Sequence, residues 1–291
     1  MDKPGVWLQV LGPLHLFDDG RPVRLGGVKP RAALGYLLLR ANQVVATSDL
    51  LHALWPHDAP PSARKVLQNA ISGLRGLLRA GDDGIALVTH PSGYSLRVPP
   101  DRLDLSRFER LAEQGRAELA AGAWEPAARS LRAALALWQG PALADLAESG
   151  VAWPELAGLR RARAAALEDL FEAELACGRH HEVSVELEAI VEHEPDRERL
   201  CAQLMLALYR CGRQVDALAL YRRVRNRLLD GYGLEPGPRL QALERAILNH
   251  DTALDLAAAA PPVPAVPSGS SRGAGRRPRF YAACGNTGAW T

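Results

Sequence analysis

The sequence predicts a mainly α protein in which a smaller region of mixed α and β structure precedes an all-helical region. Residues 1–100 alternate short strand-like runs with helical segments, whereas residues 103–250 carry almost continuous helical periodicity. The composition is rich in Ala and Leu and only 5% aromatic, which favours helices. A chain of 291 residues has room for two such regions and an additional segment.

Three short strand-like runs open the first region. They are VWLQVL at 6–11, LHLF at 14–17 and PVRL at 22–25. The Asp19-Gly20 dipeptide between the second and third runs is a strong signal of a tight hairpin, because both residues tolerate positive φ. We therefore expect an antiparallel sheet at the start of the chain.

Two helical segments follow these strands. After Pro30, residues 31–42 have the composition of a helix, and Asn42 is its expected end. Residues 47–55 form the second segment, with Thr47 and Ser48 as candidate N-caps.

A third helical segment has a polar face that carries positive charge only. Residues 60–79 read PPSARKVLQNAISGLRGLLR, and their apolar residues follow the spacing of one helical stripe. Most exposed helices mix both signs of charge, because opposite charges four residues apart stabilise a helix. The lack of acidic residues indicates an anionic partner for the opposite face, which holds Arg64, Lys65, Gln68, Asn69, Ser72, Arg75 and Arg79.

A hairpin completes the first region. Residues 85–98 contain two strand-like runs around the turn signal Pro91-Ser92-Gly93. Strands, three helices and a hairpin in this order are typical of a winged helix-turn-helix, whose third helix enters the major groove of DNA and whose hairpin lies near the phosphates. Arg suits the acceptors of guanine, and Asn and Gln suit adenine. The predicted contacts to double-stranded DNA are Arg64, Lys65, Gln68, Asn69, Ser72, Arg75, Arg79, Thr89, His90, Ser92 and Tyr94. The alternative is a solvated basic helix beside a hairpin that only completes the fold.

The helical region contains an internal repeat. Gly178 and Gly212 are 34 residues apart, the period of a tetratricopeptide helix pair, and each follows the apolar end of one helix. Gly122 lies 56 residues before Gly178, so an inserted helix and loop are expected around residues 140–150. The predicted fold is therefore a winged helix-turn-helix (α+β) followed by an all-helical tetratricopeptide-like domain. An irregular all-helical domain is the alternative for the second part.

The end of the chain has a different composition. Beyond Leu256 the sequence is dominated by Ala, Pro, Gly and Ser without apolar periodicity, which cannot bury enough surface to offset the entropy of ordering. We expect residues 251–291 to form a disordered tail.

The charges are distributed unevenly. Residues 1–100 hold 11 Lys and Arg against 7 Asp and Glu, whereas residues 101–250 hold 20 against 24. A basic first third fits an anionic partner. There is no signal-peptide pattern and no run of about 18 apolar residues, so no membrane is expected. The four cysteines form no disulfide framework, which favours a reducing compartment, so we expect a cytoplasmic, nucleoid-associated protein.

The sequence lacks the common signatures of catalysis and nucleotide binding. It has neither the G-x-S-x-G of a nucleophile elbow nor the GxxxxGK[ST] of a P-loop. Cys177, His180 and His181 lie close together, but no second Cys/His pair stands at zinc spacing, so an exposed turn is the simpler interpretation. We predict no enzyme activity, no cofactor and no metal. The main alternative function is a protein-interaction scaffold whose winged helix no longer binds DNA.

The sequence also resembles a known family. Residues 6–98 look like the winged helix of OmpR-type response regulators, and residues 103–250 look like the bacterial transcriptional activation domain. A receiver domain is not expected, since only about five residues precede the first strand. Together the two regions resemble the Streptomyces antibiotic regulatory proteins (SARP family), with domains expected at 1–100, 101–250 and 251–291. The resemblance is carried by LGPLHLF, PRAALGYLLLRANQVVATSDLLHALWP, ARKVLQNAISGLRGLL, GYSLRV, DLSRFERL and GLEPGPRLQALERAIL.

The resemblance implies a function. Members of this family are pathway-specific activators of antibiotic biosynthesis that bind direct repeats near promoters, associate on DNA and recruit RNA polymerase. By residue match, base recognition falls to the third helical segment. Within it, Gly73 and Gly76 stand where family members often carry Arg or another polar residue, and each glycine lowers helix stability by about 0.5–1 kcal/mol relative to Ala.

Overall fold

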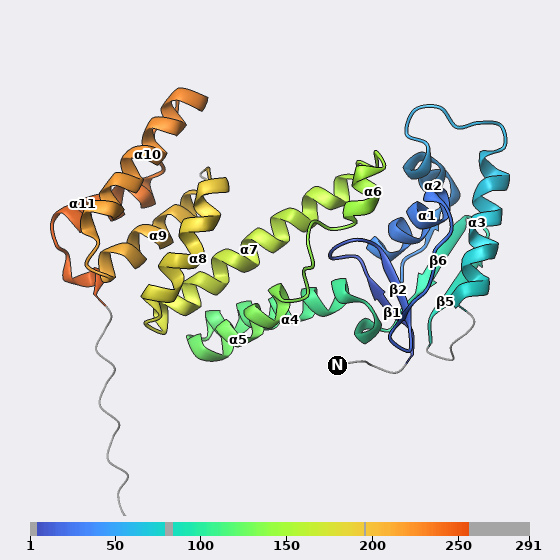
Figure 1. Cartoon of the computed structure of the whole chain (residues 1–291), viewed down its shortest axis with the longest axis horizontal. Helices are drawn as coiled ribbons and strands as arrows, with labels where there is room; N and C mark the ends of the chain where they lie inside the picture. The colour runs from blue at the N-terminus through green and yellow to red at the C-terminus, as the bar shows by residue number, and fades with distance from the viewer. Residues whose placement is uncertain (1–4, 79–83, 195, 256–291) are drawn as a thin grey trace, which may run out of the picture. The chain divides into compact units, whose positions relative to one another are not determined.

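The chain begins with two small antiparallel sheets and three helices. The computed structural model describes residues 5–78, 84–194 and 196–255, which fall in one compact unit. Strands pair in the order β1-β2-β3 in the first sheet and β4-β6-β5 in the second. Asp19 and Gly20 both have positive φ and form the predicted tight turn from β2 to β3. The elements are β1 (Trp7–Gln9), β2 (His15–Asp18), β3 (Arg21–Pro22), α1 (Val28–Leu39), β4 (Val45–Ala46), α2 (Thr47–Leu54), α3 (Ala63–Leu78), β5 (Ala86–His90) and β6 (Gly93–Arg97) (Figure 1).

Helix α1 lies three residues earlier than predicted at both ends. It spans Val28–Leu39 instead of 31–42, because Pro30 fits the first turn of a helix, where its missing N–H breaks no hydrogen bond. The chain leaves the helix before Asn42, which adopts positive φ. The Asn42 side chain donates to the Val98 carbonyl and accepts from the Val98 N–H, both at 3.0 Å. Asn42 therefore fastens the end of the hairpin to the helical part of the region.

The predicted N-caps of α2 are wrong. Thr47 and Ser48 lie inside the helix, and the capping position is Ala46, which makes no side-chain hydrogen bond. The cause is tertiary, since Ala46 ends β4 and the Thr47 N–H donates to the Ser92 carbonyl of the hairpin at 3.0 Å. Pairing with the hairpin sets where α2 begins.

The rest of the described chain is helical and contains three similar turns. Gly122, Gly178 and Gly212 all have positive φ, and each N–H donates to the carbonyl three residues earlier. The predicted repeat of helix pairs is thus present in the structure, and α6 with its loops is the predicted insertion. The helices are α4 (Asp104–Ala120), α5 (Trp124–Leu135), α6 (Ala144–Glu148), α7 (Pro154–Ala176), α8 (His180–His193), α9 (Glu198–Arg210), α10 (Gln214–Tyr232) and α11 (Pro238–Leu248), with short 3-10 helices η1 (Pro100–Arg102) and η2 (Thr252–Leu254).

Two hydrophobic cores meet along α7. The first core runs from Val6 to Ala173, so it is shared by the winged helix-turn-helix and helices α4 to α7. The second begins at Phe171 and ends at Ile247. Ala173 lies in the first core, whereas Phe171 and Leu175 lie in the second. Helix α7 therefore links the two cores (Figure 1).

Long-range polar contacts also join residues 1–100 to the helices that follow. The Asp104 carboxylate at the start of α4 accepts hydrogen bonds from the Val10 N–H at 2.9 and 3.0 Å and from the Leu11 N–H at 2.8 Å. Burial raises the pKa of Asp104 to about 6, although these hydrogen bonds act in the opposite direction. Farther along, Asp145 of α6 pairs with Arg31 of α1. The first region is thus held against the helical region by buried contacts.

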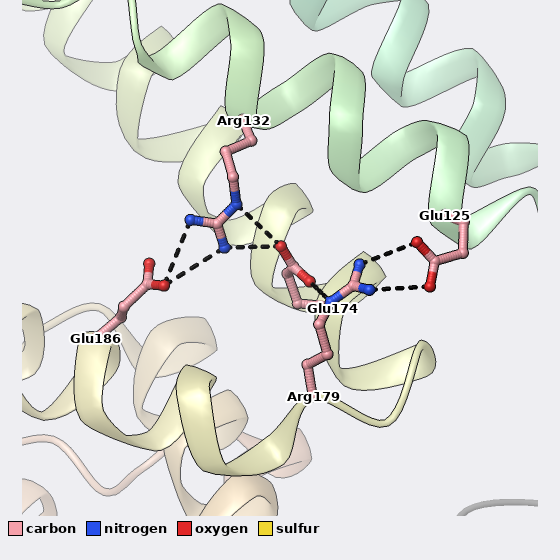
Figure 2. A network of polar contacts seen from close by, with 5 residues as sticks. All are labelled: Glu125, Arg132, Glu174, Arg179 and Glu186. Atoms are coloured by element: carbon pink, nitrogen blue, oxygen red, sulfur yellow. Dashed lines mark hydrogen bonds and ion pairs between the residues drawn. The ribbon is translucent and has the colours of Figure 1, made fainter.

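A network of charged side chains joins α5, α7 and α8 (Figure 2). Its centre is Glu174, which is almost fully buried and accepts from Arg132 Nη2 at 2.7 Å and from Arg179 Nε. Arg179 also pairs with Glu125 at 2.9 Å, and Arg132 with Glu186 at 3.4 Å. Each of the two arginines is therefore neutralised by two carboxylates.

The last described residues remain attached to the helical region. Arg210 Nε donates to the Leu254 carbonyl at 2.7 Å, so the ordered chain continues past residue 250. The rest of the predicted tail, residues 256–291, lies outside the described residues. Within the part of the chain that is described, no helix is long and apolar enough to cross a membrane.

Candidate nucleic-acid interface

Helix α3 is amphipathic, and its polar face is open. Its buried side is formed by residues such as Leu67, Ile71 and Leu74, each about 1% exposed, which pack into the first core. On the other side, five of the predicted DNA contacts are exposed. None of the five side chains forms a hydrogen bond or an ion pair with another described residue. They are Arg64, Lys65, Gln68, Asn69 and Ser72.

Arg75 differs from the other predicted residues of α3. It is half-buried, its Nε donates to the Leu87 carbonyl at 3.0 Å and its Nη2 donates to Thr89 Oγ1. Both acceptors belong to β5, the strand that lies next to α3 (Figure 1). Sequence reasoning placed Arg75 and Thr89 separately against DNA, whereas the structure brings them together as a link between α3 and the hairpin.

The hairpin presents a short tip. Thr89 and Ser92 are exposed, and Pro91 and Ser92 form a two-residue turn, since His90 pairs with Gly93 across it. A Cβ on Gly93 would lie 1.9 Å from the Val45 carbonyl oxygen, so only glycine allows β4 to reach β6 at this point. The tip is thereby held close to the N-terminus of α2.

Two predicted hairpin residues make contacts within the protein. His90 Nε2 lies 2.8 Å from Ser95 Oγ, which orients the imidazole along the strand pair. Tyr94 is half-buried and packs against the first core, opposite Val45. Arg79 lies outside the described residues.

The geometry of α3 and the hairpin suits a polyanion. Helix α3 has no acidic residue. Its exposed cations, Arg64 and Lys65, form no ion pair with a carboxylate of the described chain. Arg and Lys attract phosphates, and exposed Gln and Asn offer paired donors and acceptors to base edges.

Sequence reasoning missed the role of Asn42 in fastening the hairpin. Its only local signal is an Asn at the end of a helix, a position that often adopts positive φ.

The described residues contain no candidate metal centre. No group of three or more His, Cys, Asp or Glu is placed to hold a metal ion in the described ranges. Cys177 and His180 lie at the predicted turn between α7 and α8, but both are half-buried and not exposed as expected. Burial raises the pKa of the Cys177 thiol and lowers the pKa of His180, which leaves both groups neutral near pH 7.

Comparisons with known proteins give a consistent result. The family model described as the bacterial transcriptional activator domain matches residues 103–248. The regulatory protein DnrI of Streptomyces peucetius is 37% identical over 255 residues, covering 85% of this chain and 94% of DnrI. The transcriptional regulatory protein EmbR of Mycobacterium tuberculosis is 41% identical over 241 residues, or 82% of this chain, and the chain spans 62% of the length of EmbR.

A solved structure has the same fold. The structure of Mycobacterium tuberculosis EmbR in complex with a low affinity phosphopeptide has a TM-score of 0.80 and 40% sequence identity, covering 85% of this chain and 66% of that chain. The predicted mainly α fold is therefore confirmed. Both relatives are named as regulatory proteins. The chain belongs to the family of SARP-type transcriptional activators, which carry the bacterial transcriptional activator domain.

Proposed function

We propose that this chain binds double-stranded DNA through α3 and the β5–β6 hairpin and activates transcription of its target genes. One observation supports this most strongly: α3 exposes five cationic or amide- and hydroxyl-bearing side chains that have no partner among the described residues. Leaving such groups without partners has little structural purpose, whereas phosphates and base edges would use all of them. The family supports the activating role.

The two parts of the interface have different tasks in this proposal. The exposed residues of α3 contact phosphates and bases directly, whereas Arg75 positions the hairpin through Leu87 and Thr89. Ser92 at the hairpin tip lies near the backbone of the DNA. Arg79, His90 and Tyr94 remain proposed contacts, of which His90 and Tyr94 would act mainly by supporting the hairpin.

The helical region supplies the contacts to protein partners in this proposal. A groove of about 910 Å³ follows the length of α9 between α7 and α11, with apolar walls that include Ala202, Leu206 and Leu243. Stacked helix pairs of the tetratricopeptide type commonly bind partners in such grooves. RNA polymerase and a second copy of the chain on adjacent direct repeats are the proposed partners. Antibiotic biosynthesis, which the family resemblance implies, is the proposed pathway.

Binding to the promoter regions near the protein's own gene tests the proposal. We expect footprints on direct repeats, and an affinity for that duplex at least tenfold above the affinity for a random duplex, roughly the lower range of specific recognition. Asn69→Ala should reduce this preference, and Arg223→Ala, an exposed arginine of α10, is the matched control. Equal affinity for both duplexes, with no effect of Asn69→Ala, would support the scaffold alternative instead.

A further inference from the structure

A cavity of about 730 Å³ lies on the helical region, away from the DNA-binding face. Its walls come from the loop after α5, from the first half of α7, and from the end of α8 and the residues just after it. Cavities of this size are typical for small organic ligands. The residues used below are Trp138, Arg160, Arg161, Arg163, Leu167 and Ile190.

The cavity collects positive charge that the protein does not neutralise. Arg160 and Arg161 of α7 are exposed and form no ion pair with any described residue. Arg163 stacks its guanidinium 5.1 Å from the centre of the Trp138 ring and likewise has no carboxylate partner in the described ranges. By contrast, Arg197 at the same cavity pairs with Glu168 and Glu194. Three arginines therefore remain available to an anion.

A buried hydrogen-bond donor lies in the same cavity wall. Trp138 is only 9% exposed, and its indole N–H has no acceptor among the described residues. A buried donor without an acceptor costs about 1–3 kcal/mol, so such groups are rare in folded proteins. The indole nitrogen is itself covered by protein atoms, so an anion in the cavity would meet the arginines and not this donor.

The remaining walls are mostly apolar. The apolar part is formed by Pro141, Ala157, Ala164, Leu167, Ala189 and Ile190, together with Trp138, and the polar part also includes His193 and Glu194, the latter paired with Arg197. Apolar walls with a few converging polar groups at one side are typical of small-molecule sites.

We propose that this cavity binds a small organic anion, with an apolar body against these walls and a carboxylate, sulfonate or phosphate head at the arginines. A phosphate of bound DNA shares the head-group chemistry. A DNA phosphate, however, has no apolar group to contact the apolar walls, so the walls favour a small molecule. Trp138 belongs to the first core, and Leu167 and Ile190 pack against the second, so the ligand contacts both cores at their shared helix. This inference goes beyond the proposed function and does not depend on it.

Titration of the full-length chain with a matched pair of probes tests the inference. Naphthalene-2-sulfonate carries an anionic head, and naphthalene-2-sulfonamide has the same apolar body with a neutral head. By calorimetry we expect the sulfonate to bind with a Kd below about 1 mM, and the sulfonamide to bind about tenfold more weakly. Failure of the sulfonate to bind, or equal binding of the two probes, would overturn the assignment.

Variants separate this cavity from other surfaces. Arg160→Gln with Arg161→Gln should lower the sulfonate affinity about tenfold, because two exposed charges are lost without disturbing a core. Arg222→Gln with Arg223→Gln on α10 is the matched control and should change neither affinity.

The same variants distinguish the two sources of an anion. If the α7 double variant lowers the affinity for duplex DNA and leaves sulfonate binding unchanged, these arginines contact DNA and the small-molecule site is excluded. If sulfonate binding falls while DNA affinity is retained, the cavity site holds. Because the calorimetric titration contains no DNA, a failure of the proposed DNA-binding function leaves its result unaffected.

Discussion

The basic side chains of α3 and those of the helical region differ in what they contact. Arg64 and Lys65 are exposed and pair with no carboxylate of the described chain. Several arginines of the helical region instead hold two or more carboxylates at once. Arg199 is one example, with ion pairs to Glu168 and Asp169, and Arg179 in the network of Figure 2 is another.

This difference separates structural from functional charge. The helical region has slightly more acidic than basic residues, and several of its arginines are neutralised by carboxylates of neighbouring helices. Helix α3 contains no acidic residue at all. An exposed cation without an ion-pair partner adds little to the stability of the fold. Its presence is better explained by an anion supplied from outside, and the predictions below test each side of this contrast.

The largest expected effect concerns the buried carboxylate between the two regions. Asp104→Ala should lower the free energy of unfolding by about 3–5 kcal/mol, because the N–H groups of Val10, Leu11 and Leu105 would all lose their acceptor. Chemical denaturation measures this loss. Ser106→Ala, at a half-buried position of the same helix, is a mild control. Equal effects of the two substitutions would show that the contact is unimportant.

The raised pKa of Asp104 predicts that the stability of the chain depends on pH. Burial raises the pKa of Asp104 from 3.8 to about 6, so between these values the folded chain binds more protons than the unfolded chain. The contribution of Asp104 to stability is therefore full below about pH 4, falls as the pH rises and is constant above about pH 6. The difference in unfolding free energy between the natural chain and Asp104→Asn should shrink over this range by on the order of 3 kcal/mol. A difference that grows with pH would mean that the backbone hydrogen bonds outweigh burial.

The second-largest expected effect concerns Arg132 and Arg179, two arginines that are neutralised by carboxylates. Glu174→Ala removes the buried carboxylate shared by Arg132 and Arg179. The free energy of unfolding should fall by about 2–3 kcal/mol. This loss is smaller than that expected for a fully buried ion pair, because both arginines are partly exposed. DNA affinity should not change. Glu186→Ala, which removes a more exposed member of the network, should cost well under half as much. A loss of DNA binding without a loss of stability would contradict the structural assignment.

A smaller effect concerns the link between α3 and the hairpin. Arg75→Ala should weaken binding to specific and random duplexes alike, by about 1 kcal/mol, because the hairpin loses its fastening while the base-contacting face of α3 is kept. Thr89→Val, which removes only one acceptor, should act in the same direction and less strongly. A loss restricted to the specific duplex would instead make Arg75 a base-reading residue.

The smallest effect concerns helix propensity. A Cβ at Gly73 would meet no atom within 4 Å, so Gly73→Ala should stabilise the chain by about 0.5–1 kcal/mol. Thermal unfolding measures the gain. Gly115→Ala is the contrasting substitution, since its Cβ would lie 2.5 Å from Leu131 Cγ and should destabilise the chain. The account of α3 as an open face would be wrong if Gly73→Ala were destabilising.

Much of the fold follows from local patterns. The stripe of α3, the Asp19-Gly20 turn and the repeated glycine turns all depend on residues close together in sequence, and the structure contains each of them. The exposed face of α3 is therefore predictable. Its binding partner is not, because exposure alone does not identify a ligand.

What could not be predicted depends on residues far apart in sequence. Asp104 bonds to Val10 across 94 positions, and no local signal marks either residue. The pairing of Arg75 with Thr89 and the start of α2 at Thr47 likewise depend on where the hairpin lies. Tertiary contacts of this kind override local preferences for caps and for exposed charge.

The salt dependence of DNA binding tests the central contrast most directly. For a chain with Arg64→Ala and Lys65→Ala, the slope of log affinity against log salt concentration should become shallower by about 2, since two phosphate contacts are lost. For a chain with Arg213→Ala and Arg225→Ala, which removes two exposed arginines that pair with carboxylates of the helical region, the slope should equal that of the natural chain. An unchanged slope in the α3 double variant, or equal changes in the two double variants, would contradict the assignment of α3 to DNA.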